Sequence, residues 1–204
     1  NVDSSVMAEY LAKFLDFHLK KTSKSTIGMN DEDLESKVRE TIYIFKLIES
    51  KDTFESFYMR ALSRRLLLQK SASFEAEKVM FSRLRSECSN EFTTKTENML
   101  KDLTESEAFL KEYTIICGGT EAMGKMYDNI DSSFQVLSAG SWPIGAQISS
   151  IIYPEPLQTI QENFRKHYGK KHQGKVLQFA PQMSTCLIFG NFMKKPNGTY
   201  GRQH

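Results

Sequence analysis

The chain has 204 residues, of which 40% are hydrophobic and 25% charged, and its formal net charge is +2 at pH 7. This length suffices for one large or two small domains, and the near-neutral charge gives no whole-chain signal for nucleic-acid binding. The three widely spaced cysteines argue against a disulfide framework and a zinc site. No apolar run approaches the ~20 residues of a membrane span, and no signal peptide is recognisable. We therefore expect an intracellular protein, cytoplasmic or nuclear, and a fragment, since the chain opens on Asn1 rather than Met.

Apolar residues recur at spacings of three and four through the first part of the chain, which predicts α-helices. The first helix is expected to end at Lys20-Lys21, and Asn30 is expected to cap the second. A third helix is predicted over residues 52–69, and Ser71 or Ser73 caps the fourth. The inward residues are expected to be Met7, Leu11, Phe14 or Leu15, and Leu19 in the first helix; Leu34, Val38, Ile42, Phe45 and Ile48 in the second; Phe54, Phe57, Ala61 and Leu62 in the third; and Ala76, Met80, Leu84 and Cys88 in the fourth.

Two capping-box patterns follow, Thr94-x-x-Glu97 and Thr104-x-x-Glu107, and they predict the starts of two short helices. The connections are short throughout, which favours antiparallel neighbours packed as a bundle. We therefore expect a mainly α chain in which residues 1–127 form an antiparallel helical bundle.

The pattern becomes mixed beyond Gly118-Gly119. Strands are predicted by polar–apolar alternation and by short apolar runs, while Pro143 and Pro156 indicate a turn and the first turn of a helix. The expected elements are strands over 133–137, 176–179 and 185–189, a turn over 140–145, and a helix from about 156 to 168 with Leu157, Ile160 and Phe164 on one face. Residues 128–204 are therefore predicted to form a small α+β domain.

No constellation of catalytic, cofactor-binding or metal-binding residues is recognisable. The four histidines, His18, His167, His172 and His204, form no H-x-x-x-H pair, and the spacing of five between His167 and His172 does not place both on one helical face. There is no G-x-S-x-G motif and no glycine-rich phosphate loop. We expect no catalytic residue, no metal and no cofactor.

Five blocks of sequence carry a family resemblance in the right order. They are the basic helical segment 51–80 (KDTFESFYMRALSRRLLLQKSASFEAEKVM), Leu84-x-x-Glu87-Cys88 with Phe92-Thr93-Thr94-Lys95, Met99-Leu100-Lys101-Asp102, Val136-Leu137-x-x-Gly140-x-Trp142-Pro143, and residues 168–179 (YGKKHQGKVLQF). Together they resemble the cullins, the scaffolds of multi-subunit ubiquitin ligases, from about Met7 to Phe189.

The chain departs from the family pattern at several places. Ser89 stands where the pattern has glycine, one cation of the block around Gly174 is lost, and Phe179 replaces its final tryptophan. These departures indicate a divergent member. The resemblance implies the four-helix bundle of the cullin homology region and the start of its α/β domain, without the N-terminal repeats that dock substrate adaptors and without the winged-helix region that carries the modified lysine.

The resemblance also implies a function, namely a non-catalytic scaffold of a cullin-RING ubiquitin ligase. A RING-box protein would add a strand to the α/β unit, and the candidate contacts are Val136, Leu137, Trp142, Lys175, Leu177 and Phe179. A basic patch of Arg60, Arg64 and Arg65 would attract acidic segments of a transiently bound ubiquitin-conjugating enzyme. The alternatives are strands that pair with each other, Trp142 as a core residue, a solvated basic face, and Arg65 as a member of a buried ion pair.

Two other functions remain open from the residues. A cullin-domain protein without ligase activity would use the same fold as an interaction or regulatory module. A nucleic-acid binder is the weaker hypothesis, because residues 60–70 lack the aromatic spacing of single-strand binders. The expected partners are thus proteins, with no nucleic acid and no membrane among them.

Overall fold

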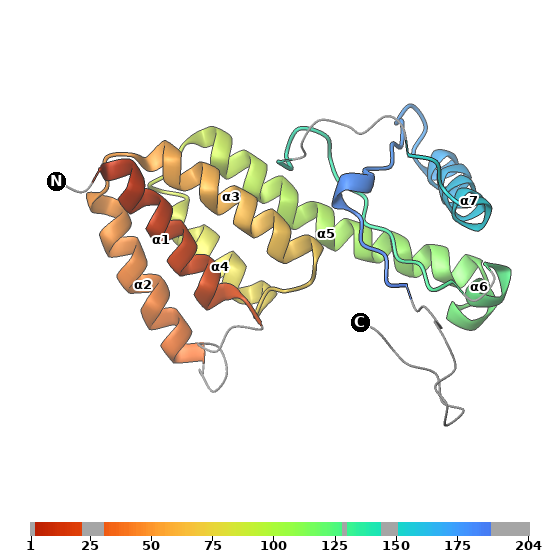
Figure 1. The fold of residues 1–204 in the computed structure, drawn as a ribbon, viewed down its shortest axis with the longest axis horizontal. Helices are drawn as coiled ribbons and strands as arrows, with labels where there is room; N and C mark the ends of the chain where they lie inside the picture. The colour runs from red at the N-terminus through yellow and green to blue at the C-terminus, as the bar shows by residue number, and fades with distance from the viewer. Residues whose placement is uncertain (1–2, 22–30, 128–129, 144–150, 189–204) are drawn as a thin grey trace, which may run out of the picture.

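The computed structural model describes residues 3–21, 31–127, 130–143 and 151–188, and residues 31–35 only by their backbone (Figure 1). Over these residues the chain is mainly helical, as predicted. The helices are α1 (Ser4–Leu19), α2 (Asp31–Leu47), α3 (Lys51–Leu67), α4 (Phe74–Leu84), α5 (Asn90–Ile116), α6 (Thr120–Met126) and α7 (Glu155–Lys171), with a 3-10 turn η1 (Pro181–Met183). The predicted Asn30 cap, the Leu34 side chain, Phe189 and His204 lie outside the described residues.

Helix α1 packs against α3 through small and branched residues in alternation. Its buried side chains are Ala8, Leu11, Ala12, Leu15 and Leu19, at the spacing of three and four that the sequence indicates. Met7, expected inside, is exposed, and of the alternatives Phe14 and Leu15 it is Leu15 that is buried. The face is shifted because Ala8 and Ala12 let the two helix backbones approach closely, and larger side chains would hold them apart.

The rest of the bundle follows the predicted helical faces closely. Val38 and Phe45 of α2 are buried, and so are Ile48 directly after it and Phe54 and Leu62 of α3. Ile42, Phe57 and Ala61 are half-buried. The ring of Phe54 lies between those of Phe45 and Tyr58, at centroid distances of 4.5 and 5.6 Å. Ser73 caps α4, since its hydroxyl accepts a hydrogen bond from the Ala76 amide.

Helix α5 is one continuous helix of 27 residues, so the prediction of two short helices over this stretch is wrong. Ser89 is its N-cap and accepts from the Phe92 amide at 3.2 Å. The Thr104 hydroxyl does not cap a helix but donates to the Leu100 carbonyl at 3.2 Å, within the same helix. A threonine that bonds back to the preceding turn leaves the helix unbroken.

The length of α5, about 40 Å, lets it serve two hydrophobic cores. Phe92 and Met99 in its first half belong to the bundle core with α1, α2, α3 and α4. Phe109 and Tyr113 in its second half belong to a separate core with α6 and α7. In Figure 1 the bundle lies along one end of α5, and α6 and α7 lie near the other.

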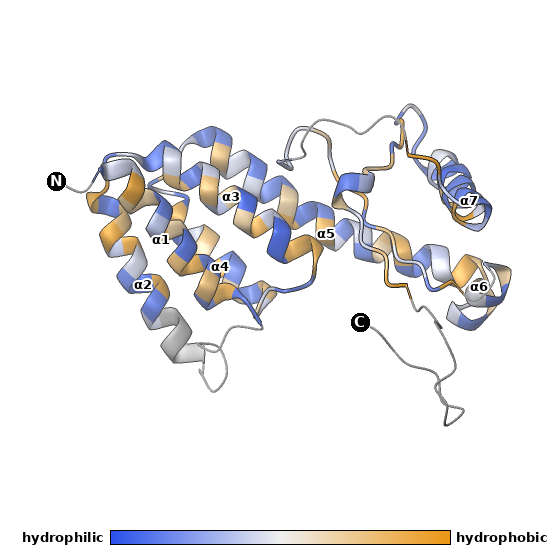
Figure 2. Ribbon diagram, in the orientation of Figure 1, coloured by the Kyte–Doolittle hydropathy of each residue, from blue (hydrophilic) through white to orange (hydrophobic). Residues whose placement is uncertain are grey.

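Helix α7 supplies one apolar side to the second core, as its sequence predicts. Pro156 lies in its first turn, and its buried residues Ile160, Phe164 and Tyr168 recur every four residues. Figure 2 shows the outer side of α7 as hydrophilic. The Phe164 ring stacks on Phe134 at 4.0 Å and meets Phe109 edge-on at 5.7 Å. These aromatic contacts hold α7 and the extended chain around residue 134 against α5.

The segments predicted as strands, residues 133–137, 176–179 and 185–188, are extended but do not form a sheet. Within the described ranges, the only isolated sheet-type bridge joins Lys20 and Ser71, in the bundle. Alternation predicts an extended conformation, whereas a strand also needs a neighbouring backbone to bond. Residues 136–142 form hydrogen bonds with side chains of α5 instead of with a neighbouring strand.

Three polar residues of α5, Asn98, Asp102 and Ser106, form what we call the polar stripe. They are spaced by four and therefore lie on one face of the helix. The Val136 amide donates to Ser106 Oγ at 2.7 Å, and Asn98 Nδ2 donates to Ser141 Oγ at 3.1 Å. Segment 136–141 thus runs antiparallel to α5.

Asp102 makes the central attachment of the polar stripe. One carboxylate oxygen accepts from the Ser138 amide, the Ser138 hydroxyl and the Trp142 indole, each at 2.7 Å. Gly140, with φ of 87°, makes the turn that brings both residues to the same acceptor. Trp142 is only 4% exposed and packs into the bundle core. It therefore fills the junction between the two cores, which is the core role left open above.

Replacing Asp102 by alanine should destabilise the chain by roughly 1–3 kcal/mol, because it leaves the indole N–H of the buried Trp142 without an acceptor and removes the two hydrogen bonds that fix Ser138. Urea unfolding followed by circular dichroism measures this loss. Trp142 is the single tryptophan, so its native-state emission should also shift to longer wavelength as the turn loosens. Glu105→Ala is the matched control on the exposed side of α5. An Asp102→Ala variant with the unfolding midpoint of this control would contradict the assignment.

Candidate functional site

The residues proposed to contact a RING-box protein separate into two groups. Lys175, Leu177 and Phe179 line a groove beside α7. Val136 and Leu137 are half-buried away from it, Val136 against the second core and Leu137 against the bundle core. With Trp142 inside the junction, the structure brings together only the three residues of the later block as an accessible surface.

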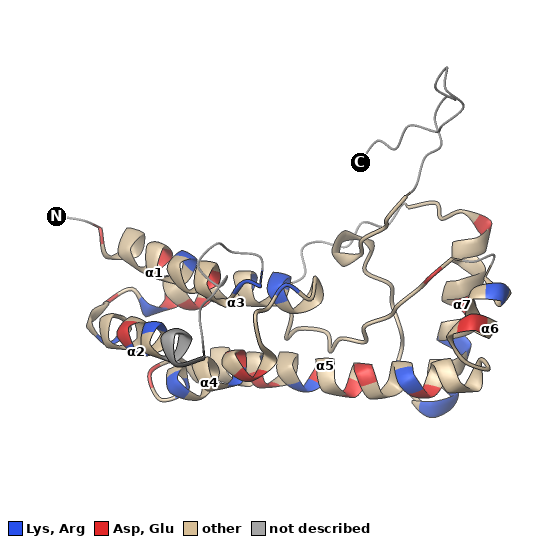
Figure 3. Cartoon of the chain, turned by 90° about the horizontal axis from the view of Figure 1, so that it is seen from below, with Lys and Arg blue, Asp and Glu red and all other residues tan. Residues whose placement is uncertain are grey.

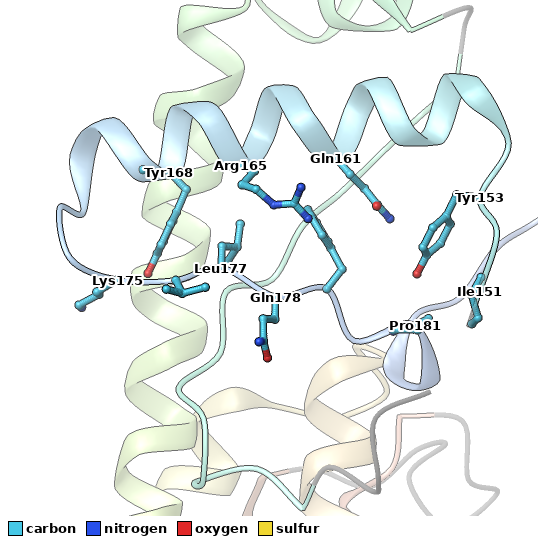
Figure 4. Close-up of a pocket in the computed structure, with 12 residues that line it drawn as sticks. Ile151, Tyr153, Gln161, Arg165, Tyr168, Lys175, Leu177, Gln178 and Pro181 are labelled. Carbon is cyan, nitrogen blue, oxygen red and sulfur yellow. The ribbon is translucent and has the colours of Figure 1, made fainter. Parts of the chain in front are cut away.

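The groove lies between α7 and the extended segment that follows Gly174 (Figure 4). Its volume is about 590 Å³. From α7, the side chains of Gln161, Arg165 and Tyr168 point toward the extended segment, and Tyr153 and Ile151 stand at the far end. Pro181 closes it below, so the groove has two walls of protein and an open side.

The extended segment has the alternation of a strand with one covered face. Gly174, with φ of 81°, turns the chain back from the end of α7, and the segment runs on from Lys175. Leu177 and Phe179 are half-buried against the second core, whereas Val176 between them is 85% exposed. The covered face fixes the segment's position, and the side chain of Val176 on the other face lies toward solvent.

Arg165 gives the groove its electrostatic character. The guanidinium carbon lies 5.2 Å from the centroid of the Phe179 ring, a distance at which a cation is attracted to the aromatic face. Tyr168 at the same wall is buried, and this burial together with the charge of Asp102 raises the pKa of its phenol. Tyr168 therefore stays protonated and neutral at the groove.

Arg65 is not on the surface that the sequence assigned to a conjugating enzyme. Its side chain is 0% exposed, and its guanidinium forms a bidentate pair with Glu77, through Nε at 2.8 Å and Nη2 at 3.0 Å. Nη1 donates to Asp16 of α1 at 2.6 Å. The alternative of a buried ion pair is thus what the structure contains, and Arg65 joins α3 to α4 and α1.

The carboxylates around Arg65 are themselves well supplied with donors. The Ser71 hydroxyl donates to Glu77 Oε1 at 2.8 Å, which gives Ser71 a role in this network rather than as a helix cap. Burial opposes ionisation of Asp16, but hydrogen bonds from Lys20 and Arg65 outweigh it and hold the pKa of Asp16 below its usual range. The buried charges are therefore paired and hydrogen-bonded, as burial requires.

Arg60 and Arg64 remain as the exposed part of the predicted basic patch. Arg60 Nη2 donates to Ser56 at 2.9 Å, and its guanidinium lies 5.4 Å from the Phe57 ring centroid. Figure 3 shows cations and carboxylates interspersed along α5. Their role in docking stays a prediction.

Metal ligands and thiols are the candidate reactive groups over the described ranges. No cluster of three or more histidine, cysteine or acidic residues there is placed to hold a metal ion. Burial and the neighbouring Glu55 carboxylate raise the pKa of the Cys88 thiol to about 12, so it stays protonated and is a poor nucleophile. None of the helices over these residues is both long and apolar enough to cross a membrane.

Sequence reasoning missed Gln161 and Arg165 of the groove. The signal was present, because residues 161, 165 and 168 lie on one side of the predicted helix, next to the apolar residues Ile160 and Phe164. A polar row beside an apolar row marks the edge of a buried helix face. That edge is where a groove forms when a second segment packs alongside.

Two sequence profiles match the chain. The one described as the Cullin alpha solenoid domain matches residues 1–110, and the one described as the Cullin alpha+beta domain matches residues 136–201. The chain is 36% identical to Cullin-4 of Dictyostelium discoideum over 194 residues, which are 95% of this chain and 23% of that protein. It is 33% identical to Cullin-1 of the same organism over 200 residues, 98% of this chain and 25% of that protein. The chain thus spans about a quarter of the length of these relatives.

Replacing Arg65 by alanine should cost about 3–5 kcal/mol of unfolding free energy, because it leaves Glu77 buried without its counterion. Urea unfolding of the variant measures this cost. Arg64→Ala, one residue away and exposed, should change stability by under ~0.5 kcal/mol.

A double variant, Arg65→Met with Glu77→Leu, removes both charges at once. It therefore shows whether the cost of Arg65→Ala comes from the lost ion pair itself or from the unpaired charge left on Glu77. Removing both charges should recover most of the stability, since apolar residues of similar size replace a buried pair at little cost. The assignment would be wrong if Arg65→Ala unfolded at the same urea concentration as Arg64→Ala.

Proposed function

Because this chain belongs to the cullin family, we propose that it is a non-catalytic part of the scaffold of a cullin-RING ubiquitin ligase. The scaffold acts by holding other proteins in place, in the cytoplasm, the nucleus or both. Substrate adaptors would bind through the N-terminal repeats of such a scaffold. The observation that supports the proposal is the open extended segment beside α7.

The RING-box protein binds, in this proposal, by adding a strand to residues 175–179. An added strand gains affinity from backbone hydrogen bonds and register from alternate side-chain pockets. The segment offers both, because its backbone is extended and its groove is lined by Leu177, Phe179 and Tyr168. Val176, Leu187 and Ile188 are each more than 80% exposed, and such exposed apolar side chains are expected where a partner binds.

The alternative function is an interaction or regulatory module without ligase activity. Phe179 in place of tryptophan and Val176 in place of a cation favour it, because both changes fall in the segment that would receive the partner. Ser89 does not favour it. Its hydroxyl caps α5 and donates to Glu55 of α3 at 2.7 Å, so this departure serves the bundle.

Co-expression with a RING-box protein, followed by size-exclusion chromatography, tests the proposal. We expect a one-to-one complex, and we expect Leu177→Pro to abolish it, because proline removes a ladder N–H in the middle of the segment. Asn90→Pro is the matched control, since the first helical position of α5 tolerates proline. If the folded wild-type chain forms no complex, the alternative function replaces scaffolding.

The conjugating enzyme is proposed to approach the exposed pair Arg60 and Arg64. Charge attraction at such a surface raises the association rate more than the affinity. Reversing both to glutamate should therefore lower the association rate several-fold at low salt, with a smaller difference at high salt. Stopped-flow binding measures both rates. A double reversal at Lys101 and Lys111, which are exposed on α5, should leave the rate nearly unchanged, and an equal effect of the two double variants would refute a localised site.

A further inference from the structure

The groove beside α7 carries positive charge without a compensating negative one. Of the residues that line it, Arg165 and Lys175 are cationic and none is a carboxylate. Within the part of the chain that the structure describes, no aspartate or glutamate forms an ion pair with Arg165. The remaining lining residues are apolar, aromatic or amide side chains. An occupant of this groove therefore meets two cations, and no carboxylate, among otherwise uncharged lining residues.

Arg165 is also held in place. Its guanidinium lies over the Phe179 ring at 5.2 Å, and Phe179 is anchored against the second core. Stacking on an aromatic face leaves the edge of the guanidinium, with its N–H donors, free to face a ligand. Figure 4 shows Arg165 reaching from α7 toward the extended segment, across the space that an added strand would enter.

From this geometry we propose that Arg165 determines which strand the groove accepts, by pairing with an aspartate or glutamate on the incoming strand. The inference rests on the proposed strand addition and names the partner's chemistry. In an added strand, alternate side chains point to the same side. One of them faces α7 near Arg165, and the guanidinium recognises a carboxylate there through two parallel hydrogen bonds. Neighbouring apolar side chains of that strand would face Leu177 and Tyr168.

The test is a fluorescence titration of the whole chain with a full-length RING-box protein at low and high salt. Arg165→Gln should weaken binding roughly fivefold at low salt, which is about 1 kcal/mol, and should reduce its salt dependence. Arg165→Lys keeps the charge but loses the planar guanidinium, so its affinity should lie between that of the wild-type chain and that of Arg165→Gln. Lys166→Gln is the matched control, because Lys166 is the next residue of α7, is exposed and does not line the groove.

A charge swap identifies the carboxylate on the partner. Each aspartate or glutamate of the partner's added strand is changed to lysine in turn and titrated against the wild-type chain and Arg165→Glu. One of these lysine variants should bind Arg165→Glu better than it binds the wild-type chain.

The outcomes separate the two proposals. If the wild-type chain forms no complex, strand addition itself fails and the inference falls with it. If the complex forms and Arg165→Gln binds as tightly as Lys166→Gln, or if no partner lysine rescues Arg165→Glu, Arg165 does not select the strand. Strand addition would then stand without this inference.

Discussion

The attachment of residues 136–142 to the polar stripe of α5 sets the position of the second half of the chain. A carboxylate that accepts three hydrogen bonds at 2.7 Å from residues on both sides of a turn allows little freedom to that turn. The same contact places Trp142 between the two cores. It also connects two blocks of the family pattern, since Asp102 ends one and Trp142 stands in another. Those blocks are separated in sequence but form one structural unit.

The bundle uses buried charge for a related purpose. Arg65 binds carboxylates from two other helices, and a guanidinium fork accepts only a narrow range of geometries. The trio therefore specifies how α1, α3 and α4 meet, in addition to the hydrophobic packing that draws them together. This explains why the basic segment of the sequence is only partly a surface feature: Arg60 and Arg64 are exposed, and Arg65 is inside.

The helices could be predicted because each buries a stripe at its own period, which is a local property of the sequence. The continuity of α5 could not be predicted, because Thr104 and Glu107 match the pattern of a helix start. In the structure the Thr104 hydroxyl instead bonds to the Leu100 carbonyl inside the same helix. The groove was predicted in part. Leu177 and Phe179 were found from family blocks, whereas Arg165 becomes visible only when α7 and the extended segment are placed side by side. Whether an extended segment becomes a strand depends on a neighbouring backbone, which its own residues do not encode.

A single helix that spans both cores also has a mechanical consequence. Because α5 is about 40 Å long, it behaves as a lever whose fulcrum is the bundle. A tilt of about 1° at Met99 would move the far end of α5, about 25 Å further along, by about 0.4 Å, and α6, α7 and the groove would move with it. Repacking of a few side chains around Phe92 or Met99 can therefore reorient whatever is bound beyond Phe109. Packing inside the bundle therefore influences the geometry at the far end of α5.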